Sequence, residues 1–238
     1  ESLNRLASMA DIQGRQEQRL ALLEEFAREV DRTGTRSNIK GFSHLATAYA
    51  AAGRFEDAHA ASARAESMLT ERGDPRIAGI IMRDRADILW REGRMNEARS
   101  AFARALDLSQ EAGDPNAWSA CLFKAGRFYT ETGDFSAASD ALRASIEMRK
   151  TTEQPYWALE AVDQFALLLH ARGAYADALL VARAGAHLKG DSGVAGAENE
   201  LTSVHWDAVL TEAEQDAITL RAARMSFDDL FAFIAAHA

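Results

Sequence analysis

The stretch that decides the fold runs from Gly93 to Pro115 and reads GRMNEARSAFARALDLSQEAGDP. Its glycine, an alanine five residues later and its proline all recur at intervals of 40 residues: Gly53, Gly93, Gly133 and Gly173; Ala58, Ala98, Ala138 and Ala178; Pro75, Pro115 and Pro155. A period of this length is typical of a solenoid, in which each unit packs on its neighbours. We therefore expect a stack of similar units on both sides of this stretch.

One helix of this unit can be derived directly from the spacing of its apolar residues. Met95, Ala98, Phe102 and Ala105 recur at steps of three and four, which places them on one helical face. The remaining face is polar, so the pattern predicts an amphipathic helix that is packed on one side. The helix should end at Gly113, because glycine accepts the left-handed conformation that closes many helices.

The same pattern organises the rest of the chain. We expect an all-α fold of stacked antiparallel helix pairs, because no segment shows the period-2 alternation of a strand. The predicted organisation is a single solenoid over residues 1–238, with a degenerate helical pair over 1–35, repeats over 36–75, 76–115, 116–155 and 156–195, and C-terminal capping helices over 196–238.

The C-terminal part departs from the repeat. Residues 190–196 predict the longest loop of the chain, followed by a helix over 197–210. Thr211 and Ser226 each begin a Ser/Thr-x-x-acid capping box that opens a further helix. The last helix has an apolar side and is expected to close the end of the stack, with Phe227, Leu230, Phe231 and Ile234.

The composition and charge argue against binding to nucleic acid or to an anionic membrane as the main function. The chain has 238 residues and a formal net charge of −9, which opposes nucleic acid or an anionic membrane as the main partner. A single cysteine, Cys121, cannot form an internal disulfide, and no apolar run reaches the length of a membrane span. We expect a cytoplasmic protein. Because the chain opens with Glu1 and no signal peptide, we also expect it to be part of a longer protein.

The chemical motifs in the sequence favour a non-enzymatic protein. Ser192 stands in a Gly-Asp-Ser-Gly tetrad like that of serine proteases, but those enzymes need a β-barrel context that an all-α fold lacks. The six histidines show no metal-ligand spacing, and no glycine-rich phosphate loop occurs. We therefore expect no cofactor and no metal, and an unreactive Cys121.

The repeats resemble the tetratricopeptide repeat in a 40-residue form. The small and bulky positions of that family's first helix correspond to Ala46, Ala86, Gly126 and Ala166, and to Tyr49, Leu89, Tyr129 and Leu169. The large apolar position after the glycine corresponds to Phe55, Met95, Phe135 and Tyr175, and a small position near the end of the second helix to Ala65, Ala105, Ser145 and Gly185. The resemblance implies a right-handed superhelical α-solenoid.

A finer resemblance concerns the kind of protein. Alanine- and arginine-rich 40-residue repeats that end in Gly-Asp-Pro-like breaks look like the C-terminal sensor regions of bacterial ATPase-linked transcriptional regulators of the MalT and AfsR kind. The segment from Arg224 to Leu230 is similar to the closing segment of such proteins.

The tetratricopeptide resemblance also implies a binding groove, because the first helices of that family line a concave surface. The positions carried over to this chain are His44, Thr47, Arg83, Asp87, Trp90, Arg91, Phe123, Lys124, Arg127, Glu131, Asp163, Gln164 and His170. Aromatic and arginine side chains are common anchors in interfaces. Trp90 and Phe123 are equally consistent with core packing.

Three functions follow as hypotheses. The first is the sensor or interaction domain of a larger regulator, which binds a protein or peptide, another domain of its own chain, or a small effector. The second is a stand-alone adaptor. The third is an enzyme with its site in the groove, which the absence of a converging nucleophile, base and orienting group disfavours.

Overall fold

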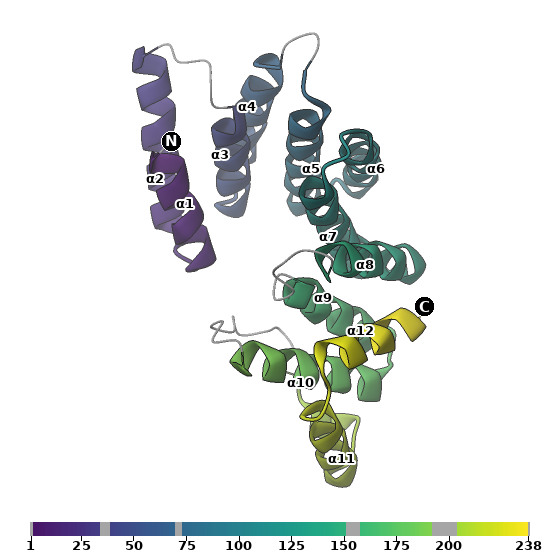
Figure 1. Cartoon of the computed structure of the whole chain (residues 1–238). Helices are drawn as coiled ribbons and strands as arrows, with labels where there is room; N and C mark the ends of the chain where they lie inside the picture. The colour runs from purple at the N-terminus through teal and green to yellow at the C-terminus, as the bar shows by residue number, and fades with distance from the viewer. Residues whose placement is uncertain (1, 34–38, 70–72, 151–157, 192–203, 238) are drawn as a thin grey trace. The chain divides into compact units, whose positions relative to one another are not determined.

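The chain is helical throughout the part that the structure describes. This computed structural model describes residues 2–33, 39–69, 73–150, 158–191 and 204–237 (Figure 1). The helices are α1 (Ser2–Ile12), α2 (Gln16–Thr33), α3 (Ile39–Ala51), α4 (Phe55–Ser67), α5 (Pro75–Arg91), α6 (Met95–Glu111), α7 (Pro115–Glu131), α8 (Phe135–Lys150), α9 (Ala158–Ala171), α10 (Tyr175–Asp191), the 3-10 helix η3 (Trp206–Ala208), α11 (Glu212–Ala222) and α12 (Phe227–Ala236). The prediction of an all-α fold is confirmed. None of these helices combines the length and apolar character that a bilayer-crossing segment needs.

The turn inside each helix pair is built on its glycine. Gly93 adopts φ 84°, a left-handed conformation that side chains with a Cβ rarely take. This conformation lets the N–H of Arg94 donate to the carbonyl oxygen of Leu89 at 2.9 Å, and α6 begins one residue later. The equivalent glycines of the other predicted repeats also have positive φ, namely Gly53, Gly133 and Gly173. The recurring glycine therefore reverses the chain at each of these turns.

The break between one helix pair and the next has the predicted glycine and proline at the junction of α6 and α7. Gly113 has φ 65°, directly after the C-cap of α6, as expected for its left-handed role. Asp114 then caps the next helix, because its Oδ1 accepts a hydrogen bond from the N–H of Asn116 at 3.0 Å. Pro115 is the first residue of α7, a position where its missing N–H has no helical partner to lose.

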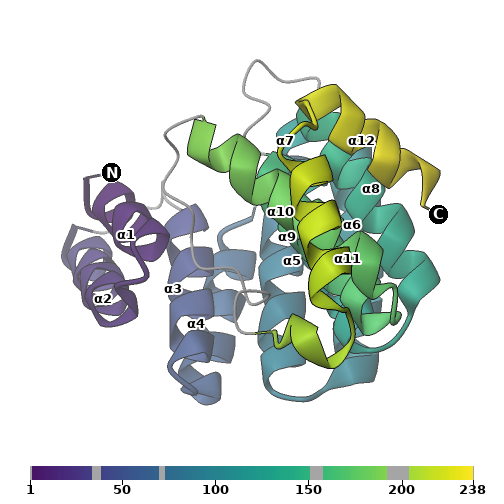
Figure 2. The same cartoon turned by 90° about the horizontal axis from the view of Figure 1, so that it is seen from below.

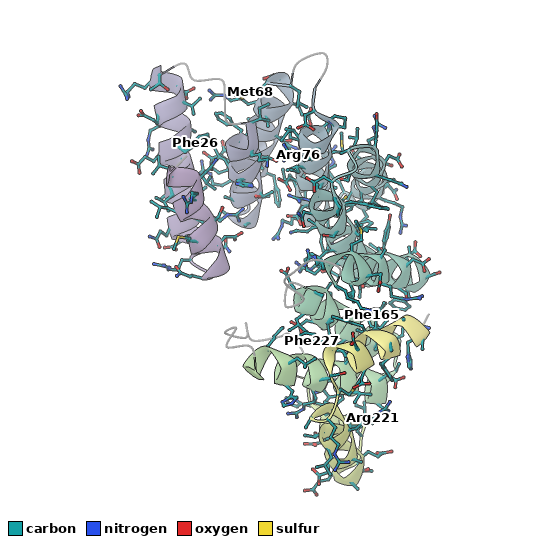
Figure 3. All side chains as sticks on the ribbon, in the orientation of Figure 1. Phe26, Met68, Arg76, Phe165, Arg221 and Phe227 are labelled. Atoms are coloured by element: carbon teal, nitrogen blue, oxygen red, sulfur yellow. The ribbon has the colours of Figure 1, made fainter. Side chains whose placement is uncertain are left out.

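The chain divides into two compact units, residues 1–121 and 122–238, and the division falls within α7. In unit 1, α3 packs against α2, α4 and α5, and Figure 1 shows these helices in chain order along the unit. Phe26 of α2, labelled in Figure 3, packs against Phe42 of α3, with ring centroids 5.5 Å apart. The apolar stripes predicted from the sequence thus pack against one another within this unit.

Unit 2 has a core of aliphatic and aromatic side chains around α9. Phe165 of α9 is fully buried (Figure 3), and α9 packs against both α8 and α10. Both predicted capping boxes are present, at Thr211 for α11 and at Ser226 for α12. Helix α12 lies beside α8 (Figure 2) and also contacts α10, with Leu230, Phe231 and Ile234 buried. Its predicted apolar side is therefore its packed side.

Two predictions about the segment after α9 are wrong where the structure describes it. Helix α10 continues to Asp191, so Gly190 is helical rather than the start of a loop. Residues 192–203 lie outside the described part, and the predicted helix over 197–210 is only the short η3 within residues 204–210. A longer helix does not form over residues 204–210 for two reasons. The side chain of Trp206 is buried, and the cap at Thr211 begins a new helix only a few residues later.

Close helix approach explains the small residues of the repeat. Ala46, Ala86 and Ala166 are almost fully buried. A Cβ on Gly126, the glycine at the same repeat position, would stand 2.6 Å from Cγ of Leu142 on α8. In this pair the helices are too close even for alanine, and the side chain of Leu142 fills the space instead.

Candidate partner-binding surface

The predicted groove residues lie on the first helices of the pairs and divide between the two units. Unit 1 holds those on α3 and α5: His44, Thr47, Arg83, Asp87, Trp90 and Arg91. Unit 2 holds those on α7 and α9: Phe123, Lys124, Arg127, Glu131, Asp163, Gln164 and His170. Each set is described within its own unit.

A buried carboxylate lies at the centre of the unit 1 set. Asp84 of α5 accepts a hydrogen bond at Oδ2 from Oγ of Ser43 on α3, at 2.6 Å. Its Oδ1 accepts from Nε and Nη2 of Arg83, at 2.9 and 2.6 Å. Burial disfavours a charged guanidinium, but the charge and hydrogen bonds of Asp84 outweigh it and raise the pKa of Arg83. The ion pair holds Arg83 in place, and the hydrogen bond from Ser43 joins α3 to α5.

A second carboxylate holds Arg91 one turn further along the same helix. Asp87 is buried, and its Oδ2 accepts from Nε of Arg91 at 3.1 Å. The Arg91 side chain is 42% exposed, so its terminal N–H groups face solvent while Nε is anchored. Arginine anchored in this way loses little further conformational freedom on binding.

His44 and Thr47 lie beside this pair on α3. Thr47 Oγ1 accepts a hydrogen bond from Nη2 of Arg19 on α2 at 2.7 Å. Burial lowers the pKa of His44, and the positive charges of Arg19, Arg83 and Lys40 add to the effect against the opposing charge of Asp84. His44 is therefore neutral at pH 7. The sequence did not single out Arg19 or Lys40, because they lie outside the motif positions of the repeat.

Trp90 belongs to the core of its helix pair. Its side chain is 9% exposed, and its ring meets that of Phe102 on α6 edge to face, with centroids 6.4 Å apart. This geometry favours the core interpretation of Trp90 over a role as a binding anchor.

Phe123 is buried as well, in unit 2. The guanidinium of Arg149 on α8 lies over its ring, 5.3 Å from the centroid. This cation–π contact covers the aromatic face that a partner would otherwise use.

The other predicted residues of unit 2 are partly engaged by the unit itself. Asp163 of α9 forms an ion pair with Lys189 of α10. His170 packs edge to face against Trp206 of η3, with ring centroids 5.6 Å apart. Lys124, Arg127 and Gln164 are half-buried, and Glu131 is exposed. The sequence missed Trp206 because it follows the last repeat, where no periodic position identifies its neighbour.

Cys121 and the possible metal ligands among the described residues bear on catalysis and metal binding. Burial raises the pKa of the Cys121 thiol to about 12, against the opposing effects of Arg83 and of a hydrogen bond with Ser109. The thiol is thus protonated at neutral pH and a poor nucleophile. Ser192 lies outside the described residues. Among the described side chains, no group of three His, Cys, Asp or Glu is placed to hold a metal ion.

What the unit 1 surface offers chemically is a set of oriented hydrogen-bond donors. The anchored guanidinium of Arg91 carries solvent-facing N–H groups, and the neutral His44 lies on the adjacent helix. The hydroxyl of Thr47 already donates to the carbonyl oxygen of His44. Guanidinium groups bind carboxylates and carbonyl oxygens with defined geometry. The surface is therefore suited to recognition.

Comparison with known proteins agrees with the helical repeat. A family model described as tetratricopeptide repeat matches residues 78–151. No curated protein matches the chain. Among solved structures, BtubC (BKLC) from P. vanneervenii is similar over 100% of this chain and 92% of its own, with 17% identity and a TM-score of 0.61.

A second solved structure is a Podosopora anserina protein assigned as a kinesin light chain with nearly identical TPR-like repeats. It is similar over 82% of this chain and 96% of its own, with 16% identity and a TM-score of 0.56. At such identities the likeness concerns the fold. The chain thus has a TPR-like solenoid fold, and residues 78–151 match the tetratricopeptide repeat itself.

Proposed function

We propose that this chain is a non-enzymatic recognition scaffold that binds a peptide segment of a partner protein on the surface formed by α3 and α5. TPR-like scaffolds are typical of protein-interaction domains, and stacked repeats of this kind expose extended surfaces for binding. The observation that carries the proposal is the anchored Arg91, whose Nε is held by the buried Asp87 while its terminal N–H groups face solvent.

The charge of the surface formed by α3 and α5 indicates which kind of peptide it would bind. The predicted groove residues include a local excess of basic groups that would attract an acidic partner, namely Arg83, Arg91, Lys124 and Arg127. Two of these, Arg83 and Arg91, are instead paired with the carboxylates of Asp84 and Asp87. The local excess of positive charge is therefore small. We infer a peptide that offers one carboxylate and several backbone carbonyls, rather than a run of acidic residues.

Peptide display on the full chain tests this function. A random peptide library is selected on the chain, and the enriched peptides are titrated by calorimetry against the parent and against Arg91→Gln. Glutamine keeps a donor for Asp87 but removes the charge, so affinity should fall at least about tenfold, as for a hot-spot residue. Arg104→Gln, at an exposed arginine of α6, should leave affinity unchanged.

Two results would contradict the proposal. One is that no peptide is enriched over a bare support. The other is that the enriched peptides bind Arg91→Gln and the parent equally, with circular dichroism confirming that both are folded. The second result would place the peptide on another surface.

The biological setting that we propose is the sensor or interaction domain of a larger bacterial regulator. What supports it is the resemblance of the Gly-Asp-Pro breaks and of the segment from Arg224 to Leu230 to regulators of the MalT and AfsR kind. The second candidate is a stand-alone adaptor with the same TPR-like fold. Sequencing the gene around this coding region decides between them, because a regulator requires an ATPase core in the same reading frame.

A further inference from the structure

A pocket between α8 and α12 carries an arginine that has no partner among the described residues. The pocket has a volume of about 350 Å³ and is lined by Asp140, Arg143, Ala144, Ile146, Glu147, Phe231, Ile234 and Ala235. This volume lies at the low end of the range for small-molecule sites. All of its lining belongs to unit 2, whereas the proposed peptide surface on α3 and α5 belongs to unit 1.

Arg143 has an unmet capacity for hydrogen bonding. Its Nε is buried and has no acceptor, and within the described part of the chain its guanidinium forms no hydrogen bond or ion pair. Asp140 and Glu147 stand three residues before it and four after it, at spacings where helical ion pairs form readily, yet neither is paired with it. A half-buried guanidinium without an acceptor is rare, because leaving such a group unsatisfied is unfavourable.

The walls of the pocket differ in character. The α12 wall is apolar, with Phe231 and Ile234 buried at its base. The α8 wall carries one positive group between two negative ones, and both carboxylates are exposed. The ammonium of Lys150 on α8 lies 5.8 Å from the ring centroid of Phe231 on α12 and 4.0 Å from Oε2 of Glu147.

We propose that this pocket binds a free α-amino acid with an apolar side chain. The ligand carboxylate pairs with the guanidinium of Arg143, which is a favourable charge-assisted geometry. The ligand ammonium pairs with the carboxylate of Asp140, three residues before Arg143 on α8, and the apolar side chain packs on Phe231 and Ile234. Neither a simple carboxylic acid nor a simple amine matches this pattern, because each leaves one sign of charge unpaired.

Calorimetric titration of the full chain with L-leucine tests the proposal. L-Leucine should bind saturably, whereas 4-methylpentanoate, which lacks the ammonium, and 3-methylbutylamine, which lacks the carboxylate, should bind at least about tenfold more weakly. N-Acetyl-leucinamide represents the apolar side chain within a peptide. Its binding as tightly as L-leucine would overturn the proposal, since the pocket would then recognise the side chain alone.

Matched variants connect the binding to the pocket. Arg143→Gln should weaken L-leucine binding at least about tenfold, and Ala144→Leu should block it by filling the cavity. Arg183→Gln, at an exposed arginine of α10, should bind as the parent does. Because Arg143 has no partner to lose among the described residues, its variant should melt like the parent. No saturable binding of L-leucine, L-isoleucine or L-phenylalanine, or equal affinity in Arg143→Gln, would show the proposal to be wrong.

Discussion

Equivalent first helices pack through different side chains in the two units, an ion pair in unit 1 and an aromatic ring in unit 2. In unit 1, Arg83 is paired with the buried Asp84, which also accepts a hydrogen bond from Ser43. Forty residues further on, unit 2 has Phe123 at the position of Arg83, buried beneath the guanidinium of Arg149. The repeat thus specifies where a helix lies. The inner side chains at equivalent positions can differ, as Arg83 and Phe123 do.

The greatest loss of stability is expected from the polar packing of unit 1. Asp84→Ala removes the counter-charge and hydrogen-bond acceptor of Arg83, whose side chain is 18% exposed, and should reduce the free energy of unfolding by about 3 to 5 kcal/mol. Urea unfolding measures the change. Asp57→Ala, which breaks the exposed ion pair with Arg54, should cost at most about 1 kcal/mol.

A double variant separates loss of pairing from loss of packing. Replacing both Arg83 and Asp84 by leucine removes the two charges together and should recover much of the stability lost in Asp84→Ala. If the double variant is as unstable as the single one, the ion pair is not what Asp84 supplies.

The apolar packing of unit 2 should give the next loss. Leu230 of α12 is fully buried, and α12 packs on α8 and α10, so Leu230→Ala should cost about 2 to 5 kcal/mol through lost burial and the remaining cavity. Asp228→Asn, at an exposed position of the same helix, should stay within about 0.5 kcal/mol of the parent. Thermal melts of both variants measure these changes in stability. A Leu230→Ala variant as stable as the parent would mean that α12 does not seal this unit.

Two glycines of unit 2, Gly126 and Gly190, test whether the repeat pattern or the local packing determines the effect of a substitution. The repeat suggests that Gly126→Ala is harmless, since Ala86 and Ala166 stand at equivalent positions. The short approach to Leu142 predicts instead a loss of about 1 to 3 kcal/mol. Gly190→Ala, in an exposed helical turn with nothing near its Cβ, should stabilise by up to about 1 kcal/mol. Chemical denaturation that gives both changes the same sign would refute this packing account.

The stability of unit 1 should also depend on pH through His44, and this effect should be smaller than the losses expected for the variants above. Burial lowers the pKa of His44 below its ordinary value of 6.5, while Asp84, Arg19, Arg83 and Lys40 are the charged groups that act on it. The stability due to neutral His44 is therefore present above pH 6.5 and is lost as the pH falls below it, because the unfolded chain then binds the proton more readily. His44→Gln should lose less stability over that window. The exposed His205→Gln should follow the parent, and a parallel loss in His44→Gln would contradict the assignment.

The residues predicted for the groove lie on the first helices of their pairs, but the sequence did not reveal the surroundings of their side chains. The 40-residue interval placed each of them on the first helix of its pair. It did not reveal that Trp90 packs on Phe102 or that Arg149 covers Phe123, because both partners lie on second helices. Contacts between helices depend on side-chain lengths and rotamers across the interface, which a one-dimensional period does not encode.

The helices and turns of the repeats follow from the amino-acid sequence alone, because they depend on local properties. These are the left-handed glycine at Gly93, the cap and proline at Asp114 and Pro115, and the 3/4 spacing of apolar residues. Tertiary packing was needed to establish which charges are buried and paired, such as Asp84 with Arg83 and Ser43. It was also needed to find a charge with no partner among the described residues, such as Arg143 in the pocket beneath α12. Helix formation is governed by neighbours within a turn or two. Burial and pairing are governed instead by groups that meet only when helices distant in sequence pack together.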